Sequence, residues 1–302
     1  MLLAGKVVIV TGGGRGIGRE HCLELARHGA KLVVADPGVG VRGEATEEVP
    51  ADAVVREIQA IGGEAIADGG SVAEWETCRR LVRDAVDRFG RLDAVVNNAG
   101  ILRDRMITSM EESDFDAVIA VHLKGTFQMT KHACDHWRAV AKEGGDSAGR
   151  IVNTTSGAGL SGNVGQASYS AAKAGIVALT LVTALEMARY GVTCNAISPV
   201  AVTRMSAGIA KAGESPSPDA YDPLHPRTTS PLVAYLISGA SSWLSGQVLR
   251  VEGNTVIPMR GWEQSPDRYT ARNGGFLDAE ELVTGMRLAY RAMPRGLVTS
   301  LK

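Results

Sequence analysis

Short apolar segments rich in β-branched residues alternate with longer segments of helical periodicity, and this alternation constrains the fold of the chain more than any other feature. The short segments lack the polar alternation of a sheet with one face in water, so each is expected to be a strand covered on both faces. Strands separated by helices indicate a single α/β domain, in which a doubly wound parallel sheet lies between two layers of helices. The seven expected strands are residues 6–12, 31–36, 64–68, 92–100, 149–156, 192–198 and 247–253.

The segments between these strands predict the helices of the two outer layers. After Gly253 the alternation stops, and one further segment, 278–293, has helical periodicity. The sequence therefore predicts a domain at residues 1–253 and a C-terminal extension at 254–302, packed on the same domain or on a neighbouring subunit. The helices expected within the domain are residues 16–29, 51–61, 72–89, 112–141 and 168–190.

Two segments depart from this regular pattern. Residues 37–50, PGVGVRGEATEEVP, follow the second strand as an insertion of no clear periodicity. Residues 215–226, SPSPDAYDPLHP, have the proline and serine content of an irregular surface loop, which could serve as a lid.

Composition excludes several classes of protein. The chain is 45% apolar and 22% charged with a net charge of −1, so it lacks the basic surface that nucleic acid binding requires. It has no apolar run near the roughly 18 residues of a membrane-spanning helix, and its N-terminus does not resemble a secretion signal. The cysteines are scattered and do not cluster with histidine, which favours reduced thiols in a cytoplasmic protein and no metal site. They are Cys22, Cys78, Cys134 and Cys194.

A glycine-rich turn lies directly between the first expected strand and the first expected helix. Such a turn alone can be a simple tight turn. At this position, however, glycines allow the backbone to approach a pyrophosphate, and the start of the helix offers free N–H groups and the positive end of its dipole. The turn contains Gly12, Gly14, Gly16 and Gly18.

Asp36 ends the second expected strand about 20 residues further on. A carboxylate there can accept hydrogen bonds from the adenosine ribose hydroxyls, which is the arrangement for NAD. It would repel the 2′-phosphate of NADP by about 1 to 4 kcal/mol at 4 Å. We therefore expect NAD, although Arg15 and Arg42 could neutralise a phosphate and leave NADP open.

Tyr169 and Lys173 are four residues apart at the start of an expected helix and share one of its faces. A tyrosine needs roughly 4 kcal/mol of preferential phenolate stabilisation to become a base at neutral pH, and a nearby lysine is a source of it. Ser156, at the end of a strand, could hydrogen-bond the reacting oxygen. Such a pair alone is commonly a solvated helix face, so the hypothesis depends on its combination with the glycine turn and the serine.

These motifs together resemble those of the short-chain dehydrogenase/reductase family over residues 5–253. They are TGGGRGIG (11–18), NNAG (97–100), Ser156, YSAAK (169–173) and NAISP (195–199). The resemblance implies a Rossmann-type sheet, Tyr169 as the acid/base, Ser156 polarising the reacting group and Lys173 binding the nicotinamide ribose. It also implies cofactor contacts from Arg15, Ile17, Asn98, Ala99, Gly100, Val202 and Thr203, and from Ser71 and Val72 in place of the family's usual adenine-binding aspartate.

The substrate half is similar to a narrower group, the (3R)-hydroxyacyl-CoA dehydrogenases that include 17β-hydroxysteroid dehydrogenase type 4. The similar segments are NNAGILRDRM, VHLKGTFQ, GNVGQASYSAAKAG and CNAISPVAVTRM. The similarity implies that a secondary alcohol and a ketone are interconverted on a large apolar substrate, such as an acyl thioester or a steroid. A homodimer or homotetramer is implied as well, through the helices at 112–141 and 168–190.

His122 lies within the apolar segment 112–141. A lone histidine on such a face is most often a core residue. Most family members carry asparagine here and use it to hold a water next to the lysine, whereas the narrower group resembles this chain in having histidine. An imidazole could hold the same water and pass protons, so we expect His122 to be the fourth member of the catalytic set.

Alternative functions remain open on the sequence alone. A ketoreductase of 3-oxoacyl carrier proteins would use the same residues. A dinucleotide sensor without turnover is disfavoured because both Tyr169 and Lys173 are present, and a serine hydrolase is disfavoured because no G-x-S-x-G motif occurs. In the ILRDRM segment, Arg103 and Arg105 could bind substrate phosphate or carboxylate, although salt bridges are the more common role.

Overall fold

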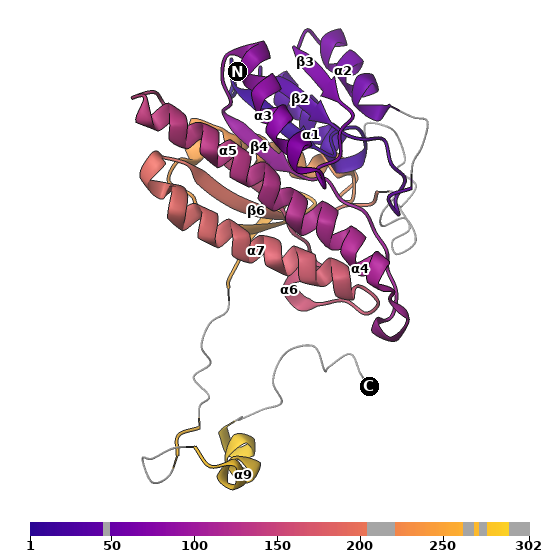
Figure 1. Ribbon diagram of the computed structural model, residues 1–302, viewed down its shortest axis with the longest axis vertical. Coiled ribbons are helices and arrows are strands. Elements are labelled where there is room, and N and C mark those ends of the chain that lie inside the picture. Colours follow the sequence, from indigo (N-terminus) through magenta and orange to yellow (C-terminus); the bar gives the residue numbers. More distant parts are fainter. Residues whose placement is uncertain (45–48, 204–220, 262–268, 272–276, 290–302) are drawn as a thin grey trace. The chain divides into compact units, whose positions relative to one another are not determined.

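The structure is a computed structural model that describes residues 1–44, 49–203, 221–261, 269–271 and 277–289. Its chain forms two compact units, Met1–Met259 and Arg260–Lys302. The first unit contains one sheet with the strand order β3-β2-β1-β4-β5-β6-β7-β8 (Figure 1). Its strands are β1 (Val7–Thr11), β2 (Lys31–Ala35), β3 (Ala65–Asp68), β4 (Ala94–Asn97), β5 (Arg150–Thr154), β6 (Thr193–Val200), β7 (Val248–Glu252) and β8 (Thr255–Met259).

Neighbouring strands from β3 to β7 are parallel, as the sequence predicts. Alternate residues of each strand face opposite layers of helices. Val8 and Val10 of β1 belong to the core on the side of α1, α2 and α8, whereas Val7 and Ile9 face α3, α5 and α7. All four are buried, so both faces of the strand must be apolar, which explains the uninterrupted apolar run in the sequence.

Helices cover both faces of the sheet and make the fold a three-layer one. Figure 1 shows α5 and α7 lying next to each other across one face. The helices of the first unit are α1 (Gly16–Arg27), α2 (Pro50–Ala60), α3 (Trp75–Phe89), α4 (Glu112–Ile119), α5 (Gly125–Lys142), α6 (Gly157–Ser161), α7 (Ala167–Met187) and α8 (Ser230–Ile237). The second unit contains α9 (Ala279–Ala289), within the helix expected at 278–293, whose residues 290–293 lie outside the described part.

The helix expected at 112–141 contains an irregularity in its middle. A π-helical turn, Ala120–Lys124, joins α4 to α5 and contains His122. π-Helical turns insert one extra residue into the helix and occur most often at functional sites. The irregularity therefore marks the segment around His122 as a candidate part of a functional site.

The expected domain boundary at Gly253 is wrong. Gly253 and Asn254 form the turn of a hairpin, and β8 continues the sheet antiparallel to β7 as far as Met259. Pro258 disguises this strand in the sequence because proline interrupts a strand pattern, yet it is tolerated on an edge strand where one side needs no ladder hydrogen bond. The sheet accordingly has eight strands instead of the expected seven.

Helix α7 is more apolar than the sequence analysis allowed. Residues 167–190 are long and apolar enough to span a membrane, with a mean hydropathy of 1.5 over 18 residues. The same composition is found in helices that pack inside a globular domain. Here α7 buries Ile176, Ala184 and Met187 against the sheet and α5, but 39% of the apolar window is buried, so packing within this chain accounts for only part of its apolar character.

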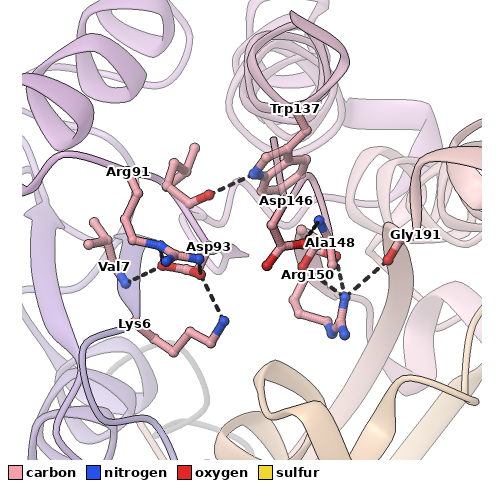
Figure 2. A network of polar contacts seen from close by, with 11 residues as sticks. Lys6, Val7, Arg91, Asp93, Trp137, Asp146, Ala148, Arg150 and Gly191 are labelled. Carbon is pink, nitrogen blue, oxygen red and sulfur yellow. Dashed lines mark hydrogen bonds and ion pairs between the residues drawn. The ribbon is translucent and has the colours of Figure 1, made fainter. Parts of the chain in front are cut away.

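Buried charges at the amino ends of the strands fix the edge of the sheet opposite the glycine turn. The carboxylate of Asp93, which is 4% exposed, accepts hydrogen bonds from the ammonium of Lys6, the backbone N–H of Val7 and the guanidinium of Arg91 (Figure 2). Arg150 is also buried, and its guanidinium donates to the backbone carbonyls of Ala148, Gly149 and Gly191. A buried charge is tolerated only when paired or hydrogen-bonded, so these residues are structural.

Parts of the two irregular segments lie outside the described residues. They are 45–48 of the 37–50 insertion and 215–220 of the 215–226 loop, so the expected lid is not described. After a 3₁₀ turn at Pro226–Thr229, the chain forms α8, which was not among the helices expected from the sequence. The strand order reverses between β1 and β4, and in sheets of this kind ligands bind at the carboxyl ends of the strands on either side of such a reversal.

Candidate active site

A cavity of about 390 Å³ lies at the carboxyl ends of β1, β2 and β4, where the strand order reverses. It runs from the glycine turn and Asp36, past the residues after β3, to the segment that follows β4. The expected cofactor residues that line it are Gly12, Arg15, Gly16, Ile17, Gly18, Asp36, Ser71, Val72, Asn98, Ala99, Gly100 and Thr203. Gly14 and Val202 do not line it: the backbone N–H of Gly14 donates to Asp36, and that of Val202 donates to the Leu224 carbonyl. Tyr169 and Lys173, also expected to contact the cofactor, line a neighbouring cavity instead.

The glycine turn is packed too closely for side chains. A Cβ atom on Gly18 would lie 2.0 Å from the carbonyl oxygen of Gly12 and 2.5 Å from the amide nitrogen of Asn98. Gly12 itself has a φ of +63°, in the left-handed region that favours glycine. The turn therefore brings bare backbone to the start of α1, and the N–H groups of the first helical turn remain available for an anion.

Asp36 holds the far end of this turn. Its two carboxylate oxygens accept hydrogen bonds from the backbone N–H groups of Gly14, at 3.0 Å, and Gly38, at 2.8 Å. Each carboxylate oxygen has a second lone pair, so these bonds leave acceptor capacity for ribose hydroxyls.

Asn98 ties the end of β4 to the glycine turn. Its side-chain amide donates to the carbonyls of Thr11 and Gly12, and its backbone N–H donates to the Thr11 hydroxyl. These bonds hold Ala99 and Gly100 on the wall of the cavity, where a resemblance to known cofactor contacts had placed them.

The insertion after β2 also lines the cavity, which the sequence did not reveal. Val39, Val41 and Gly43 form part of its wall, and the backbone N–H of Leu102 donates to the Val41 carbonyl at 2.8 Å. The insertion is thus joined to the segment that follows β4. Only the contacts between these two distant segments assign this role, because nothing in its composition does.

The cavity fits a dinucleotide by three features of its residues. It has a side-chain-free turn at a helix start for a pyrophosphate, a carboxylate for a ribose, and an elongated apolar wall for a base. When bound, a nicotinamide dinucleotide would supply the acceptor or donor of a hydride.

A second cavity, of about 220 Å³, shares part of its wall with the first. Ile17, Asn98, Gly100 and Thr203 line both. Ser156, Tyr169, Lys173 and His122, the four expected catalytic residues, line the second. The fold thus brings together side chains from the end of β5, the first turn of α7 and the π-helical turn, beside the dinucleotide cavity.

Ser156 and Tyr169 both line this cavity and are close enough to share a hydrogen bond. Ser156 is the N-cap of α6, and its hydroxyl accepts a hydrogen bond from the Ala158 N–H. Burial raises the pKa of Tyr169, a hydrogen bond with Ser156 opposes this shift, and the charge of Asp104 adds to it. The tyrosine is therefore held in its neutral, proton-donating form until a positive charge stabilises the phenolate.

Lys173 is buried with its ammonium 5.6 Å from the centre of the Tyr169 ring. Its Nζ donates to the Thr154 carbonyl at 2.6 Å, and the Thr155 hydroxyl donates to the Lys173 carbonyl. Burial lowers the pKa of Lys173 to about 7. Lys173 therefore loses its charge near neutral pH, where the resemblance requires it to stabilise the phenolate.

His122 lies against both Gly100 and Tyr169. Its ring packs edge-on to the Tyr169 ring at 5.2 Å, and a Cβ on Gly100 would lie 2.3 Å from it. Burial, together with the charge of Lys173, lowers the pKa of His122 to about 3. The imidazole is therefore neutral across the physiological range.

The two nitrogens of His122 have different surroundings. Nε2 lies 3.1 Å from the backbone N of Ile101 and 2.8 Å from its carbonyl oxygen, whereas Nδ1 is buried with no partner among the described residues. A donor and an acceptor at Nε2 accommodate either neutral tautomer. Nδ1 can thus be an acceptor in one tautomer and a donor in the other.

Several lining residues of the catalytic cavity were missed in the sequence. Gln166 could have been noticed because it precedes Tyr169 by three residues, nearly one helical turn, whereas the others carry no chemical signal. The residues missed are Leu102, Thr154, Thr155, Gln166 and Ala201, whereas Pro199 belongs to the NAISP motif.

Arg103 and Arg105 form salt bridges. Both contact the buried carboxylate of Asp114, at 3.3 and 2.6 Å. Burial raises the pKa of Asp114, but the hydrogen bond from Arg103 and the charges of the neighbouring arginines outweigh it and lower the pKa overall. The more common of the two roles considered for these arginines is confirmed. Across the described ranges, no group of three His, Cys, Asp or Glu side chains could hold a metal ion.

A dinucleotide-shaped cavity that adjoins a serine, a tyrosine and a lysine is typical of oxidoreductases that act on CH–OH groups with a nicotinamide cofactor. Residues 6–213 match the short chain dehydrogenase family, and the chain belongs to that family.

Relatives of known name support this assignment. The chain is 46% identical over 294 residues to the hydroxyacyl-CoA dehydrogenase ChsB1 of Mycobacterium tuberculosis, covering 94% of this chain and 88% of that protein. It is 42% identical to the peroxisomal multifunctional enzyme type 2 of Mus musculus, covering 86% of this chain but a third (33%) of the mouse protein. The crystal structure of a short chain dehydrogenase from Mycobacterium avium superposes with a TM-score of 0.85 at 48% identity, covering 97% and 99% of the two chains.

These findings confirm the family, the Rossmann-type fold and the oxidoreductase class expected from the sequence. A nicotinamide dinucleotide as cofactor is confirmed as well. The choice between NAD and NADP and the roles of individual site residues stay predictions.

Proposed function

We propose that this chain is an NAD-dependent dehydrogenase of 3-hydroxyacyl-CoA thioesters. The observation that carries the reaction class is the single cavity lined by Ser156, Tyr169 and Lys173, with its wall shared with the dinucleotide cavity. The substrate class rests on similarity to a hydroxyacyl-CoA dehydrogenase along nearly the whole chain.

Tyr169 is the acid/base of the proposed reaction. In the oxidation direction its phenolate would take the proton of the substrate hydroxyl, and a bound dinucleotide would accept the hydride from the carbon that carries this hydroxyl. In the reduction direction its hydroxyl returns a proton to the ketone oxygen. The Ser156 hydroxyl lies close enough to Tyr169 to hydrogen-bond the same oxygen, and a preorganised donor there stabilises the charge that develops on it.

Lys173 provides the positive charge that favours the phenolate. A cation near a phenol lowers its pKa because it stabilises the ionised form. Burial opposes both the phenolate form of Tyr169 and the ammonium form of Lys173. Since each charge favours the other, the protonation of the two groups is coupled.

His122 passes protons between the buried lysine and the exterior in this proposal. Its unpartnered Nδ1 needs a water or another polar group, since a buried polar atom without a hydrogen bond costs about 1–3 kcal/mol. A water there could exchange a proton with Nδ1, and the Ile101 backbone accommodates the tautomer change at Nε2. The ring would relay protons without becoming a cation.

Asp36 sets a preference for NAD. The carboxylate is fixed by two backbone N–H groups, so it cannot turn away from a 2′-phosphate without losing them. We expect a higher kcat/KM with NAD than with NADP. In Asp36→Asn the ratio of kcat/KM with NAD to kcat/KM with NADP should be smaller than in the wild type. Measuring kcat/KM with both cofactors in wild type and variant tests this, and a clear NADP preference in the wild-type enzyme would contradict it.

The substrate is tested by a panel of 3-hydroxyacyl-CoA thioesters, 3-hydroxyacyl carrier-protein thioesters and hydroxysteroids, with NAD and detection of NADH absorbance. We expect oxidation of the CoA thioesters. Activity on steroids but not on thioesters, or a strong preference for carrier-protein thioesters, would contradict the proposed substrate. The proposed reaction class would still hold. Tyr169→Phe should abolish turnover and retain NAD binding, whereas a dinucleotide sensor would keep its output.

We also propose that the protein is a cytoplasmic homodimer or homotetramer. Leu181, Val182 and Leu185 are large apolar side chains exposed on α7, and Phe127 is similarly exposed on α5. Helix faces of this kind are usually covered by a partner. A light-scattering mass equal to one chain would contradict an oligomer.

A further inference from the structure

Gln166 is placed to contact a substrate rather than solvent. It lines the catalytic cavity with Ser156 and Tyr169 and is 7% exposed. It is the N-cap of α7, and its carbonyl accepts from the Ser170 N–H at 2.7 Å. The backbone that carries it is thus fixed relative to the catalytic tyrosine.

Two loops meet at this residue. The backbone N–H of Arg105, after β4, donates to the Gly165 carbonyl at 2.8 Å, and Arg105 and Gln166 form a β-bridge. The loop before α7 is thereby attached to the loop after β4, and both border the catalytic cavity through Gln166 and Leu102.

The hydrogen bonds of Gln166 also determine the orientation of its side-chain amide. Its Nε2 lies 2.7 Å from a carboxylate oxygen of Asp104, and its Oε1 lies 2.9 Å from the Nδ2 of Asn163. An ionised carboxylate can only accept, so the amide nitrogen must face Asp104 and the oxygen must face Asn163. The amide cannot flip without losing both bonds.

One N–H of this amide remains for a ligand. The hydrogen bonds among the described residues use one of its two N–H groups. A buried donor favours a ligand that carries an acceptor at that point. Other polar residues also line the cavity, but the Asn98 amide donates to the Thr11 and Gly12 carbonyls and the Thr155 hydroxyl donates to the Lys173 carbonyl, so these donors are already used within the protein.

We propose that Gln166 donates a hydrogen bond to a second oxygen of the substrate, the carbonyl oxygen of the thioester, while Ser156 and Tyr169 hold the oxygen that reacts. Asp104 is the positioning residue that orients the donor. The inference rests on the proposed function and deepens it: the site selects 3-oxygenated thioesters over isolated ketones. In a 3-oxoacyl thioester the two carbonyl groups are separated by one carbon, so one short cavity can hold both.

A pair of substrates tests the inference. One is a 3-oxoacyl-CoA, and the other is the matched thioether in which CH₂ replaces the thioester carbonyl while the ketone, the chain and the CoA remain. We expect Gln166→Met, which keeps the length of the side chain and removes the donor, to lower the ratio of kcat/KM for thioester to that for thioether about ten-fold, the effect of one hydrogen bond. Gln59→Met, on the exposed side of α2, is the matched control and should leave this ratio unchanged.

Asp104 variants separate positioning from general damage. Asp104→Ala removes the acceptor for the Gln166 amide and should lower the same ratio. Asp104→Asn retains an acceptor oxygen and should restore most of it. In Gln166→Met, the further effect of Asp104→Ala on the ratio should largely disappear, because there is no amide left to orient.

The outcomes distinguish this inference from the proposed function. Equal losses on thioester and thioether in Gln166→Met would assign Gln166 a purely structural role and overturn the inference, while thioester turnover by the wild type would still support the function. An unchanged ratio would overturn it as well. Wild-type failure to reduce any 3-oxoacyl thioester would overturn both.

Discussion

At the scale of single residues, burial decides the chemistry of the catalytic set. Burial disfavours the charged forms of Tyr169, Lys173 and His122, since it raises the pKa of the phenol and lowers those of the ammonium, to about 7, and of the imidazole, to about 3. A site of this kind is electrostatically costly for a charged intermediate unless opposite charges form together. Proton movement along neighbouring groups satisfies this requirement better than ionisation of one group alone.

His122 provides a prediction at this scale. His122→Ala should lower kcat about ten-fold or more through loss of the proton path, a typical contribution for a positioned acid/base group being 10²–10⁴. NAD binding should change much less. Because the pKa of His122 lies near 3, His122 does not change its charge between pH 5 and 8. The plot of rate against pH should therefore keep the same shape in the variant over this range.

Steady-state kinetics across pH measure the loss of kcat. A separate titration, in which added NAD quenches the fluorescence of the protein, measures NAD binding. His122→Asn, which supplies a donor and an acceptor, should retain more turnover than His122→Ala. If kcat is unchanged in both variants at every pH, His122 is a core residue.

At the scale of elements, the site depends on how closely the glycine turn approaches the end of β4. The Asn98 amide bonds to the carbonyls of Thr11 and Gly12 across this contact. The carbonyl of Gly12 also lies where a side chain of Gly18 would be. Backbone of β1, α1 and β4 therefore meets at one point, and a single methyl group would separate them.

Gly18→Ala is the prediction that belongs to this scale. The added Cβ would meet the Gly12 carbonyl and the Asn98 amide, neither of which is a flexible side-chain end. Overpacking of this kind typically costs about 1–3 kcal/mol. We expect a lower Tm, measured by thermal unfolding, and a weaker affinity for NAD, measured by isothermal titration calorimetry.

Gly69→Ala is the matched control, because a Cβ there would meet nothing within 4 Å. It should leave NAD affinity unaltered. Equal NAD affinity in Gly18→Ala and wild type would show that the turn can move aside and is not the tight cradle described above.

The two loops around Gln166 show the same dependence on contacts between elements. The loop after β4 and the loop before α7 form a β-bridge between Arg105 and Gln166, although these residues lie 61 positions apart in the sequence. Through this contact the side chain of Gln166, at the start of α7, lines the second cavity. Neither loop has the residue pattern of a strand, so the pairing arises from their position at the ends of β4 and α7.

At the scale of the whole molecule, two fully buried histidines couple stability to pH. Burial lowers the pKa of both His21 and His122 from 6.5 to about 3. His21 bonds through Nδ1 to the Ser230 hydroxyl, between α1 and α8. Unfolding exposes both rings, so the unfolded chain binds more protons than the folded one between pH 6.5 and about 3.

The free energy of unfolding should therefore be highest above pH 6.5 and fall as the pH falls towards 3. Each histidine contributes up to about 1.4 kcal/mol per pH unit in this window. Urea unfolding at pH 7, 6 and 5 measures the slope, before most carboxylates become protonated. His21→Gln should reduce it by the share of one group, and an identical slope in wild type and variant would rule out the buried neutral ring.

How much of this could be predicted from the sequence differs between elements. The seven parallel strands and the helices between them follow from periodicity, because a strand buried on both faces leaves no other apolar pattern. The eighth strand and α8 were missed. Pro258 interrupts the pattern of the strand, and its pairing with β7 depends on a turn at Gly253 and Asn254 that sequence spacing does not reveal.

The sequence by itself predicted the fold class, the glycine turn, Asp36 and the candidate set of Ser156, Tyr169 and Lys173 from local pattern and motif spacing, whereas the role of His122 was predicted from the resemblance to the hydroxyacyl-CoA dehydrogenases. The tertiary structure alone decided that Val41 of the insertion and Gln166 line the two cavities. It also decided the directions in which the pKa values of the proposed catalytic groups shift. Burial and contacts between distant segments cause these effects, and a linear sequence does not specify which side chains will share a cavity.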